Sequence, residues 1–370
     1  MKKIWLVILL CVVSGVGSRW YYEEAIMTVR SENAEILYED DENITAQEND
    51  YIKWVEFNVT CEAMDKAYEY DLNTYTKEIH LNWVDLLAYL GAKYGGDFSK
   101  YKQKDMDKIA EKLLDGKTTI EKLKEEMQYF SYYQEAYGAV LGGMVGEYKL
   151  ECPADTEGMD KTVSQNETAA KWKHVYGLKA FHPIARDFPY SHYDDFGASR
   201  SYGYKRNHLG HDMMGQVGTP IIAVESGYVA ELGWNQYGGW RVGINSFDGK
   251  RYYYYAHLRK DRPFAEGLEK GDIVQAGDVI GYLGRTGYSA EENVNNIDEY
   301  HLHFGLQLIF DESQREGTNQ IWVSGYELVQ FLYKHRSQVQ RNDETKEWTR
   351  VYGIKDPAVM EWETLHLSNK

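Results

Sequence analysis

The stretch KRNHLGHDMMGQVGTP, residues 205–220, places two histidines and one aspartate among three glycines. Glycines at this density favour a strand or a loop over a helix. His208 and Asp212 are four residues apart, so they face the same side in a strand and in a helix alike. His211 is adjacent to Asp212 and is expected to point away from it. The segment therefore predicts that His208, and not His211, shares a metal ion with Asp212.

Two later segments, YYYYAHL (252–258) and EYHLHFGL (299–306), add three histidines. His301 and His303 are two residues apart and share one face of an extended strand. By the same count Tyr253, Tyr255 and His257 share a face. Together with the first segment, the pattern predicts that four histidines and one aspartate converge.

A catalytic zinc ion needs about three protein ligands and an open position for water. His208, Asp212 and one histidine of the HLH pair would supply the ligands. His257 and the other histidine would then transfer protons beside the metal. The helical HExxH signature of other zinc peptidases does not occur in the sequence, which excludes that scaffold.

The sequence around these segments, from about residue 172 onward, is typical of antiparallel β-structure. Short apolar runs alternate with glycine turns, and SFDGKR (246–251) is an Asp-Gly hairpin signal. GTPIIAVESGYV (218–229) and GDIVQAGDVIG (271–281) resemble each other as strand, turn and strand, which suggests a duplicated hairpin. Ser324 and Glu327 have the spacing of a capping box and predict a helix after the β-region.

Residues 51–150 instead have helical periodicity and cap signals, and they predict a bundle of four or five helices. The fold class expected for the whole is α+β, with a helical domain before an antiparallel β-domain. The predicted organisation has six parts: a signal peptide or short membrane anchor (1–24), an acidic linker (25–50), the helical domain (51–150), a linker (151–171), the zinc domain (172–320), and a C-terminal helix and tail (321–370).

The first residues, MKKIWLVILLCVVSGVGSRW, combine a basic start with a short apolar run, which predicts export, either with cleavage or with retention as a tether. Beyond this leader only Cys61 and Cys152 remain, and the sequence leaves open whether they form a disulfide. The net charge is −17, and we find no Lys/Arg cluster. This balance argues against a nucleic-acid partner. The oligomeric state is left open.

The three histidine segments resemble the lysostaphin-type (LytM-like) peptidoglycan metalloendopeptidases. His208-Leu-Gly-His-Asp212 with the following Gly218-Thr-Pro is similar to that family's first element, Tyr255-Ala-His257-Leu to its second, and His301-Leu-His303-Phe to its third. The resemblance covers about residues 200–310. It implies that His208, Asp212 and His303 bind Zn²⁺, and that His257 and His301 are the catalytic pair.

The resemblance also implies a catalytic tyrosine shortly before the first ligand, for which Tyr202 is preferred over Tyr204. The implied substrate is bacterial peptidoglycan, cut at a peptide bond of the stem or the cross-bridge; which bond is left open. This sequence departs from the family in the extra His211 and in a long loop at 288–300. The helical half and the tail match no family motif.

Two alternatives remain at this point. A protein of the same fold could bind the wall without catalysis and regulate another hydrolase, although such relatives usually lose ligands. The helical half could instead be a muramidase-like domain of a bifunctional enzyme. That activity needs a catalytic glutamate, for which Glu62 and Glu135 are the candidates.

Overall fold

The structure, a computed structural model, describes residues 51–152, 171–202 and 204–367. The predicted leader and acidic linker lie outside these residues, as does almost all of the predicted 151–171 linker. Within the described ranges, no helix is both long and apolar enough to cross a bilayer. Residues 51–370 group into one compact unit. The boundaries assigned from the sequence stay a prediction.

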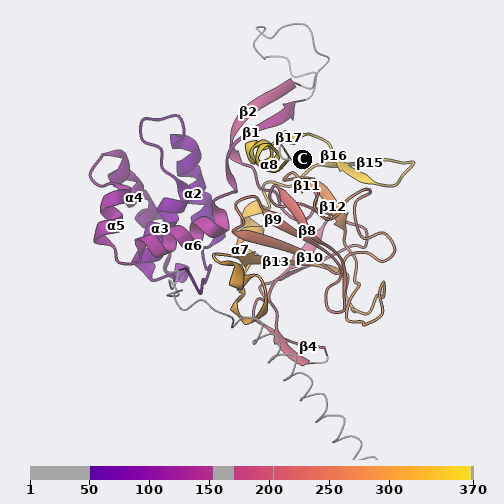
Figure 1. The fold of residues 1–370 in the computed structure, drawn as a ribbon. Helices are drawn as coiled ribbons and strands as arrows, with labels where there is room; N and C mark the ends of the chain where they lie inside the picture. Colours follow the sequence, from indigo (N-terminus) through magenta and orange to yellow (C-terminus); the bar gives the residue numbers. More distant parts are fainter. Residues whose placement is uncertain (1–50, 153–170, 203, 368–370) are drawn as a thin grey trace, which may run out of the picture. The chain divides into compact units, whose positions relative to one another are not determined.

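The N-terminal part is helical, as predicted (Figure 1). Its helices are α2 (Cys61–Thr74), α3 (Trp83–Tyr94), α4 (Gln103–Leu114), α5 (Ile120–Glu126) and α6 (Phe130–Leu141), with a 3₁₀ turn, η1 (Phe98–Lys100). The side chains of Thr60 and Asn82 accept hydrogen bonds from the first turns of α2 and α3. These caps satisfy backbone N–H groups that the helices leave unpaired, and they confirm the cap signals in this part of the sequence.

An antiparallel sheet follows and forms the body of the second part. Its strand order is β11-β8-β9-β10-β13-β6-β3, and β14 pairs with β13. The strands are β3 (Tyr190–His192), β6 (His211–Gly215), β8 (Gly227–Asn235), β9 (Gly239–Ser246), β10 (Arg251–Ala256), β11 (Ile273–Val274), β13 (His301–Leu308) and β14 (Ile321–Val323). The predicted Asp-Gly hairpin joins β9 to β10. The α+β fold class is therefore confirmed.

The two similar segments each form a strand, a turn and a strand, but neither closes as a hairpin. β7 (Pro220–Ile222) pairs with β12 (Val279–Tyr282), and β8 pairs with β11. Each segment thus bonds to the other and not to itself. Within each segment the short turn leads from one sheet to another, because β7 and β12 form one sheet and β8 and β11 belong to the larger one. The two strands of a segment therefore do not pair with each other.

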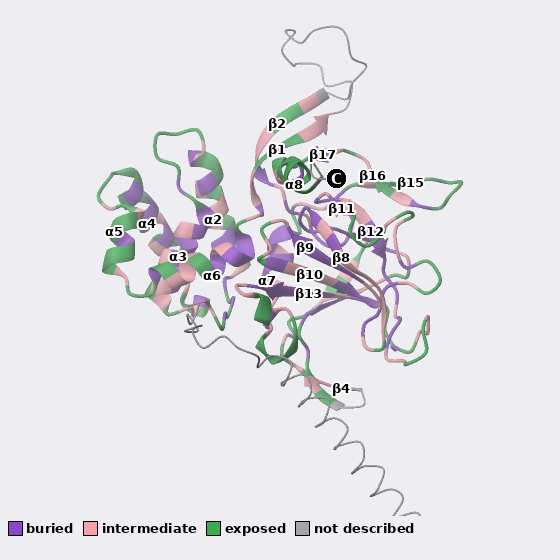
Figure 2. Ribbon diagram, viewed as in Figure 1, coloured by how far each residue is buried: buried purple, intermediate pink, exposed green. Residues whose placement is uncertain are grey.

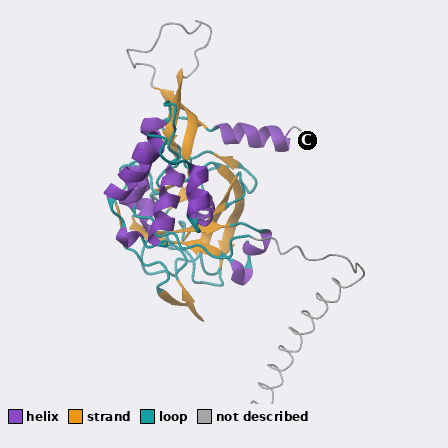
Figure 3. Cartoon of the chain, turned by 90° about the vertical axis from the view of Figure 1, so that its left-hand side faces the viewer, coloured by secondary structure: helices purple, strands orange, loops and turns teal. Residues whose placement is uncertain are grey.

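Smaller elements surround this body (Figures 1 and 3). β1 pairs with β2 and with β17, while β4 pairs with β5 and β15 with β16. Their bounds are β1 (Val145–Cys152), β2 (Lys171–Leu178), β4 (Ser199–Tyr202), β5 (Tyr204–Asn207), β15 (Val339–Arg341), β16 (Trp348–Arg350), β17 (Ile354–Lys355), η2 (Glu312–Gln314), η3 (Gly317–Asn319), α7 (Tyr326–Leu332) and α8 (Pro357–Leu367).

The helices and the sheet share one hydrophobic core, seen as the purple residues of Figure 2. Phe331 of α7 stacks on Trp83 of α3 with ring centroids 5.6 Å apart. The helix predicted after the β-region exists as α7, but its predicted capping box does not form. The carboxylate of Glu327 instead accepts a hydrogen bond from the backbone N–H of Cys61, at 2.7 Å, and so caps α2.

Cys61 and Cys152, the cysteines within the described ranges, are both free thiols.

Candidate metal centre

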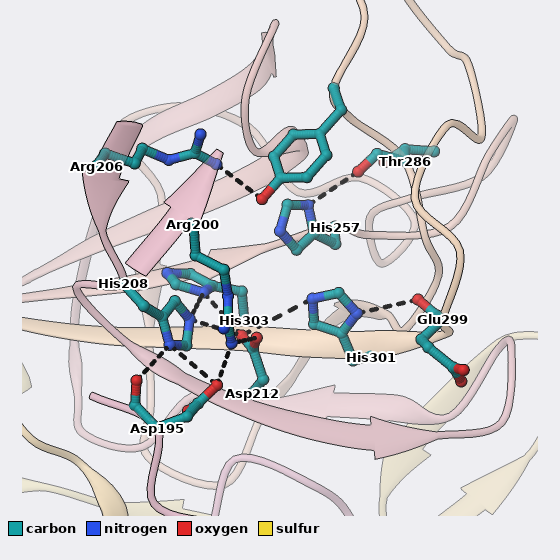
Figure 4. A network of polar contacts seen from close by, with 11 residues as sticks. Asp195, Arg200, Arg206, His208, Asp212, His257, Thr286, Glu299, His301 and His303 are labelled. Carbon is teal, nitrogen blue, oxygen red and sulfur yellow. Dashed lines mark hydrogen bonds and ion pairs between the residues drawn. The ribbon is translucent and has the colours of Figure 1, made fainter. Parts of the chain in front are cut away.

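Three ligand atoms converge where β6 and β13 lie side by side. The register of the two strands pairs Asp212 with His303, and His208 lies in the loop just before β6. The Nε2 atom of His208 is 3.0 Å from Oδ1 of Asp212 and 2.9 Å from Nδ1 of His303, and the last two atoms are 2.9 Å apart (Figure 4). This is the one such His/Asp/Glu/Cys group found among the described residues.

The orientation of His208 is set by Asp195, in the segment before β4. Nδ1 of His208 lies 3.2 Å from both the backbone oxygen and the Oδ2 atom of Asp195. Both oxygens are acceptors, so Nδ1 donates to them, and Nε2 is the ring nitrogen that faces Asp212. A hydrogen bond at one ring nitrogen is the usual way to orient a histidine whose other ring nitrogen binds a metal ion.

Gly210 makes room for the third ligand. A Cβ atom at this position would lie 2.4 Å from Cε1 and Nε2 of His303. Any other residue at position 210 would therefore displace the His303 ring. The glycine in the middle of the HLGHD segment is thus explained by close packing against a ligand.

The negative charge of the centre is the carboxylate of Asp212, a buried residue that is 7% exposed. Burial raises the pKa of a carboxyl group, but the hydrogen bonds with His208 and His303 outweigh it and hold the pKa of Asp212 well below its ordinary value. Arg200 also contributes, because its guanidinium is ion-paired with Asp195 and lies 3.5 Å from Oδ2 of Asp212. The site therefore keeps an ionised carboxylate.

His211 points away from this group. Its Nε2 atom is 2.8 Å from Nδ1 of His192, and its ring meets that of Tyr326. Burial lowers the pKa of His211 to about 3, so it stays neutral at ordinary pH. The sequence argument reached the same placement by assuming an extended or helical 208–212 segment. In the structure β6 begins only at His211, and a bend at Gly210 brings His208 to Asp212.

His257 also reaches the centre, but not as the alternation of β10 predicts. Tyr253 and Tyr255 face the core, where both pack against Phe304. His257 follows the end of the strand and has a φ of +62°, which reverses its side chain to the opposite face. The prediction that His257 shares a face with Tyr253 and Tyr255 is wrong. A positive φ on a residue other than glycine is costly, and such residues concentrate at functional sites.

His257 and His301 are held in the same way. Nδ1 of His257 donates to the backbone oxygen of Thr286 at 2.9 Å, and Nδ1 of His301 donates to that of Glu299 at 3.0 Å. Each imidazole therefore has an Nε2 lone pair, and Nε2 of His301 lies 3.8 Å from Oδ1 of Asp212. The two rings are 4.8 Å apart (Figure 4). Burial lowers the pKa of His257 well below its ordinary value, which keeps it a neutral base.

These residues fit a zinc ion. Nε2 of His208 and the ionised carboxylate of Asp212 lie within 3.0 Å of each other, and His303 adds a second imidazole nitrogen. Atoms this close are held together by a proton between them or by a metal cation that replaces it. Two imidazoles and one carboxylate form a typical ligand set of catalytic zinc, which leaves a further position open.

The predicted tyrosines lie on the hairpin next to the centre. Tyr202 ends β4 and is paired with Tyr204, which begins β5. Their side chains are outside the described part of the structure, so the prediction for Tyr202 stays a prediction. The sequence reasoning missed Asp195 and Arg200. No spacing signal marks them, since they contact His208 and Asp212 only through the fold.

A cavity of about 850 Å³ opens over the centre. His208, Asp212, His257, His301 and His303 all line it. Its wall near His257 includes Arg206, which donates a 2.7 Å hydrogen bond to the Tyr288 hydroxyl. Its volume is within the usual range of ligand-binding pockets in proteins.

Residues 206–320 match the family model described as peptidase family M23. This region is a domain of peptidase family M23. The L-Ala–D-Glu endopeptidase of Bacillus subtilis (strain 168) is 32% identical over 201 residues, 52% of this chain and 57% of that protein. The glycyl-glycine endopeptidase ALE-1 of Staphylococcus capitis is 39% identical over 99 residues, 26% of this chain and 24% of that protein.

A solved structure of LytM from Ruminococcus gnavus covers 77% of the chain and 91% of that protein, with 24% identity and a TM-score of 0.47. The chain thus spans little more than half of the first curated relative and about a quarter of the second. The M23 match includes His208, Asp212, His257, His301 and His303. The matched region begins at residue 206, so it does not include Asp195 or Arg200.

Proposed function

We propose that the chain is an exported, zinc-dependent endopeptidase that hydrolyses peptide bonds of bacterial peptidoglycan. The observation that carries the proposal is the arrangement inside the M23 domain of a His₂Asp ligand group beside two histidines with free Nε2 lone pairs. Export rests on the leader sequence at 1–24, and the peptidoglycan substrate rests on the names of the relatives.

His208, Asp212 and His303 would hold the zinc ion. A zinc ion held there would supply Lewis-acid chemistry, which activates water and a scissile carbonyl toward each other. Nε2 of His301 or of His257 accepts the proton of the attacking water, since the Nδ1 of each is already occupied by a backbone oxygen. The same nitrogen then donates the proton to the leaving amine. Arg200 forms an ion pair with Asp195 and lies 3.5 Å from the carboxylate of Asp212.

The name of the first curated relative supports a proposal for the bond. It is named for cleavage between L-Ala and D-Glu, and it shares more sequence with this chain than the M23 region alone. We therefore propose the L-Ala–D-Glu bond of the stem peptide as the bond that is cut. Mass spectrometry of the products from a defined peptidoglycan decides this point. New amino-terminal glutamate supports the proposal, and cleavage only within a cross-bridge contradicts it.

Neither alternative gains support. A non-catalytic scaffold does not require His257 and His301 to be fixed as bases beside a complete ligand group. For a muramidase, Glu62 and Glu135 are both exposed on the surfaces of their helices. A glutamate that acts as an acid is normally kept protonated by an apolar pocket, and neither position provides one.

The two histidine roles can be separated from metal binding. His257→Ala and His301→Ala should each retain zinc, measured by plasma mass spectrometry, because neither is in the ligand group. Each should lower kcat/KM on a stem peptide by on the order of 10²-fold or more, the usual contribution of a proton-transfer group. His174→Ala, an exposed histidine of β2, is the matched control and should leave both unchanged. Full activity in a folded His257→Ala and His301→Ala pair would remove the proposed mechanism.

A further inference from the structure

The cavity over the metal centre continues across the open face of the sheet, where it has an aromatic floor. Tyr252 and Tyr254 of β10 line it together with Trp322 of β14. The Tyr254 ring is 5.9 Å from that of His303, and the Tyr252 ring is 6.4 Å from that of Tyr254. The floor therefore begins beside a metal ligand and leads away from it.

Two glycines let these rings lie against the strands. A Cβ on Gly243 would be 2.2 Å from the Tyr252 hydroxyl and 2.6 Å from ring carbons of Tyr252, and a Cβ on Gly305 would be 2.6 Å from the Trp322 ring. Tyr252 and Tyr254 are inclined by only 35° to each other. Trp322 stands at 78° to Tyr252 and 79° to Tyr254. The result is a half-buried platform with an upright wall.

Polar groups border this platform. Arg241 is ion-paired with Glu231, which also accepts a hydrogen bond from the Tyr252 hydroxyl. Among the residues that the structure describes, Nε of Arg241 and Oδ1 of Asn245 are buried without a hydrogen-bond partner. Asn245 is only 5% exposed. Both residues line the cavity, so Arg241 and Asn245 place polar side chains at the edge of the platform.

We propose that the platform of Tyr252, Tyr254 and Trp322 binds the pyranose ring of an N-acetylated amino sugar that is linked to the substrate peptide. This inference rests on the proposed function and adds a glycan subsite to it. One face of a pyranose carries only C–H groups and fits a flat aromatic surface, while its hydroxyl and acetamido groups require polar partners at the edge. An apolar peptide side chain would not need the Arg241, Glu231 and Asn245 border.

The length of the floor agrees with the position of the cut. A peptide residue spans roughly 3.5 Å when extended, so the platform lies about two or three residues from the metal centre. In peptidoglycan the stem peptide is joined to its sugar through the amino end. A sugar on the platform therefore places a bond close to that end at the metal, as the proposed L-Ala–D-Glu specificity requires.

The test compares one stem peptide with the same peptide carrying N-acetylmuramic acid at its amino end. The unmodified protein should show a kcat/KM about tenfold higher on the muramoyl-peptide, mostly through KM, as expected for one aromatic contact. Tyr252→Leu and Trp322→Leu should reduce this ratio toward one, and Tyr252→Phe should keep it because the ring remains. Trp54→Leu, which removes a 65% exposed tryptophan elsewhere, is the matched control and should keep the ratio.

A ratio near one in the unmodified protein, or a ratio unchanged in both leucine variants, overturns the subsite while leaving the peptidase proposal intact. Hydrolysis of neither substrate overturns the proposed function instead. In that case the subsite is decided by titrating the zinc-loaded protein with the disaccharide N-acetylglucosaminyl-N-acetylmuramic acid. The indole N–H signal of Trp322, assigned as the one lost in Trp322→Leu, should shift in nuclear magnetic resonance spectra. No shift at millimolar disaccharide excludes the inference.

Discussion

Two clusters of buried charge in the same β-region differ in one respect. Around Arg251, which is 1% exposed, the chain supplies every partner: the guanidinium makes two hydrogen bonds with Glu225, at 2.7 and 3.0 Å, and others with Asp248 and with the backbone oxygen of Ala139 in α6. Around Asp212 the chain assembles two imidazoles and a carboxylate, and among the described residues Arg200, at 3.5 Å, is the one arginine or lysine that contacts Asp212. A buried cluster completed by the chain joins elements together, whereas one left incomplete binds a ligand.

The largest expected effect is on the incomplete cluster. His208→Ala, Asp212→Ala or His303→Ala in residues 51–370 should each abolish stoichiometric zinc and lower kcat by on the order of 10³-fold or more, since the metal supplies several kcal/mol to the transition state. The thermal transition of the metal-free protein should change little. His211→Ala is the matched control and should keep its zinc. Loss of zinc in His211→Ala but not in His208→Ala contradicts the assignment.

The opposite outcome is expected for the complete cluster. Arg251→Met leaves Glu225 buried without its partner and should lower the free energy of unfolding by about 3–5 kcal/mol. The double variant Arg251→Met with Glu225→Leu should recover much of this loss, because the remaining charge is removed too. Zinc per folded chain should stay constant. Lys117→Met, from the exposed pair with Asp115, is the control and should change the stability by less than about 0.5 kcal/mol. Denaturant titration with zinc analysis measures both quantities.

Asp195 tests the comparison of the two clusters further, because it contacts His208 in the cluster around Asp212 without belonging to the ligand group. Asp195→Ala removes the carboxylate from His208 and Arg200 and should weaken zinc affinity by about 10–100-fold, the usual effect of a residue that orients a ligand. Competition with a chelator measures the affinity. The exposed neighbour Asp194→Ala should leave it unchanged. An unaltered affinity in Asp195→Ala shows that His208 is oriented by the backbone oxygen alone.

The last effect, which is small near neutral pH and grows as the pH falls, concerns a buried group kept neutral instead of paired. His182 is fully buried between the Tyr190 hydroxyl and the backbone of Ile184, and burial lowers its pKa from 6.5 to about 3. The unfolded chain binds this proton below pH 6.5 and the folded protein does not. Stability from this group is therefore complete above pH 6.5 and is lost as the pH falls toward 3, by about 1.4 kcal/mol per pH unit.

His182→Gln should reduce the slope of unfolding free energy against pH by about that amount between pH 6 and pH 4. Urea titrations of both proteins across this range measure the difference. His174→Ala, at an exposed position, should leave the slope as it is. Equal slopes in His182→Gln and the unmodified protein show that His182 does not take up its proton on unfolding.

Much of the fold could be predicted because its signals are local. Thr60 and Asn82 cap their helices with their own side chains, and Asp248-Gly249 forms its hairpin from neighbouring residues. Alternation along β13 placed His301 and His303 on one face for the same reason, whereas His208 reaches Asp212 through a bend at Gly210 and not through the assumed extended or helical spacing. The sequence by itself determined which histidine and aspartate side chains could hold a metal ion.

Only the tertiary structure decided which contacts are made by Glu327, His257, Asp195 and Arg251. The spacing of Glu327 predicted a cap for its own helix, yet it caps α2 because packing brings Cys61 to it. His257 reaches the metal centre through a positive φ that the count along β10 cannot show. Asp195 contacts His208, and Arg251 joins α6 to the sheet, across distances in the chain at which no spacing rule applies. Contacts of this kind depend on which strands pair and how the elements pack, and these are set by the energy of the whole core and not by any one segment.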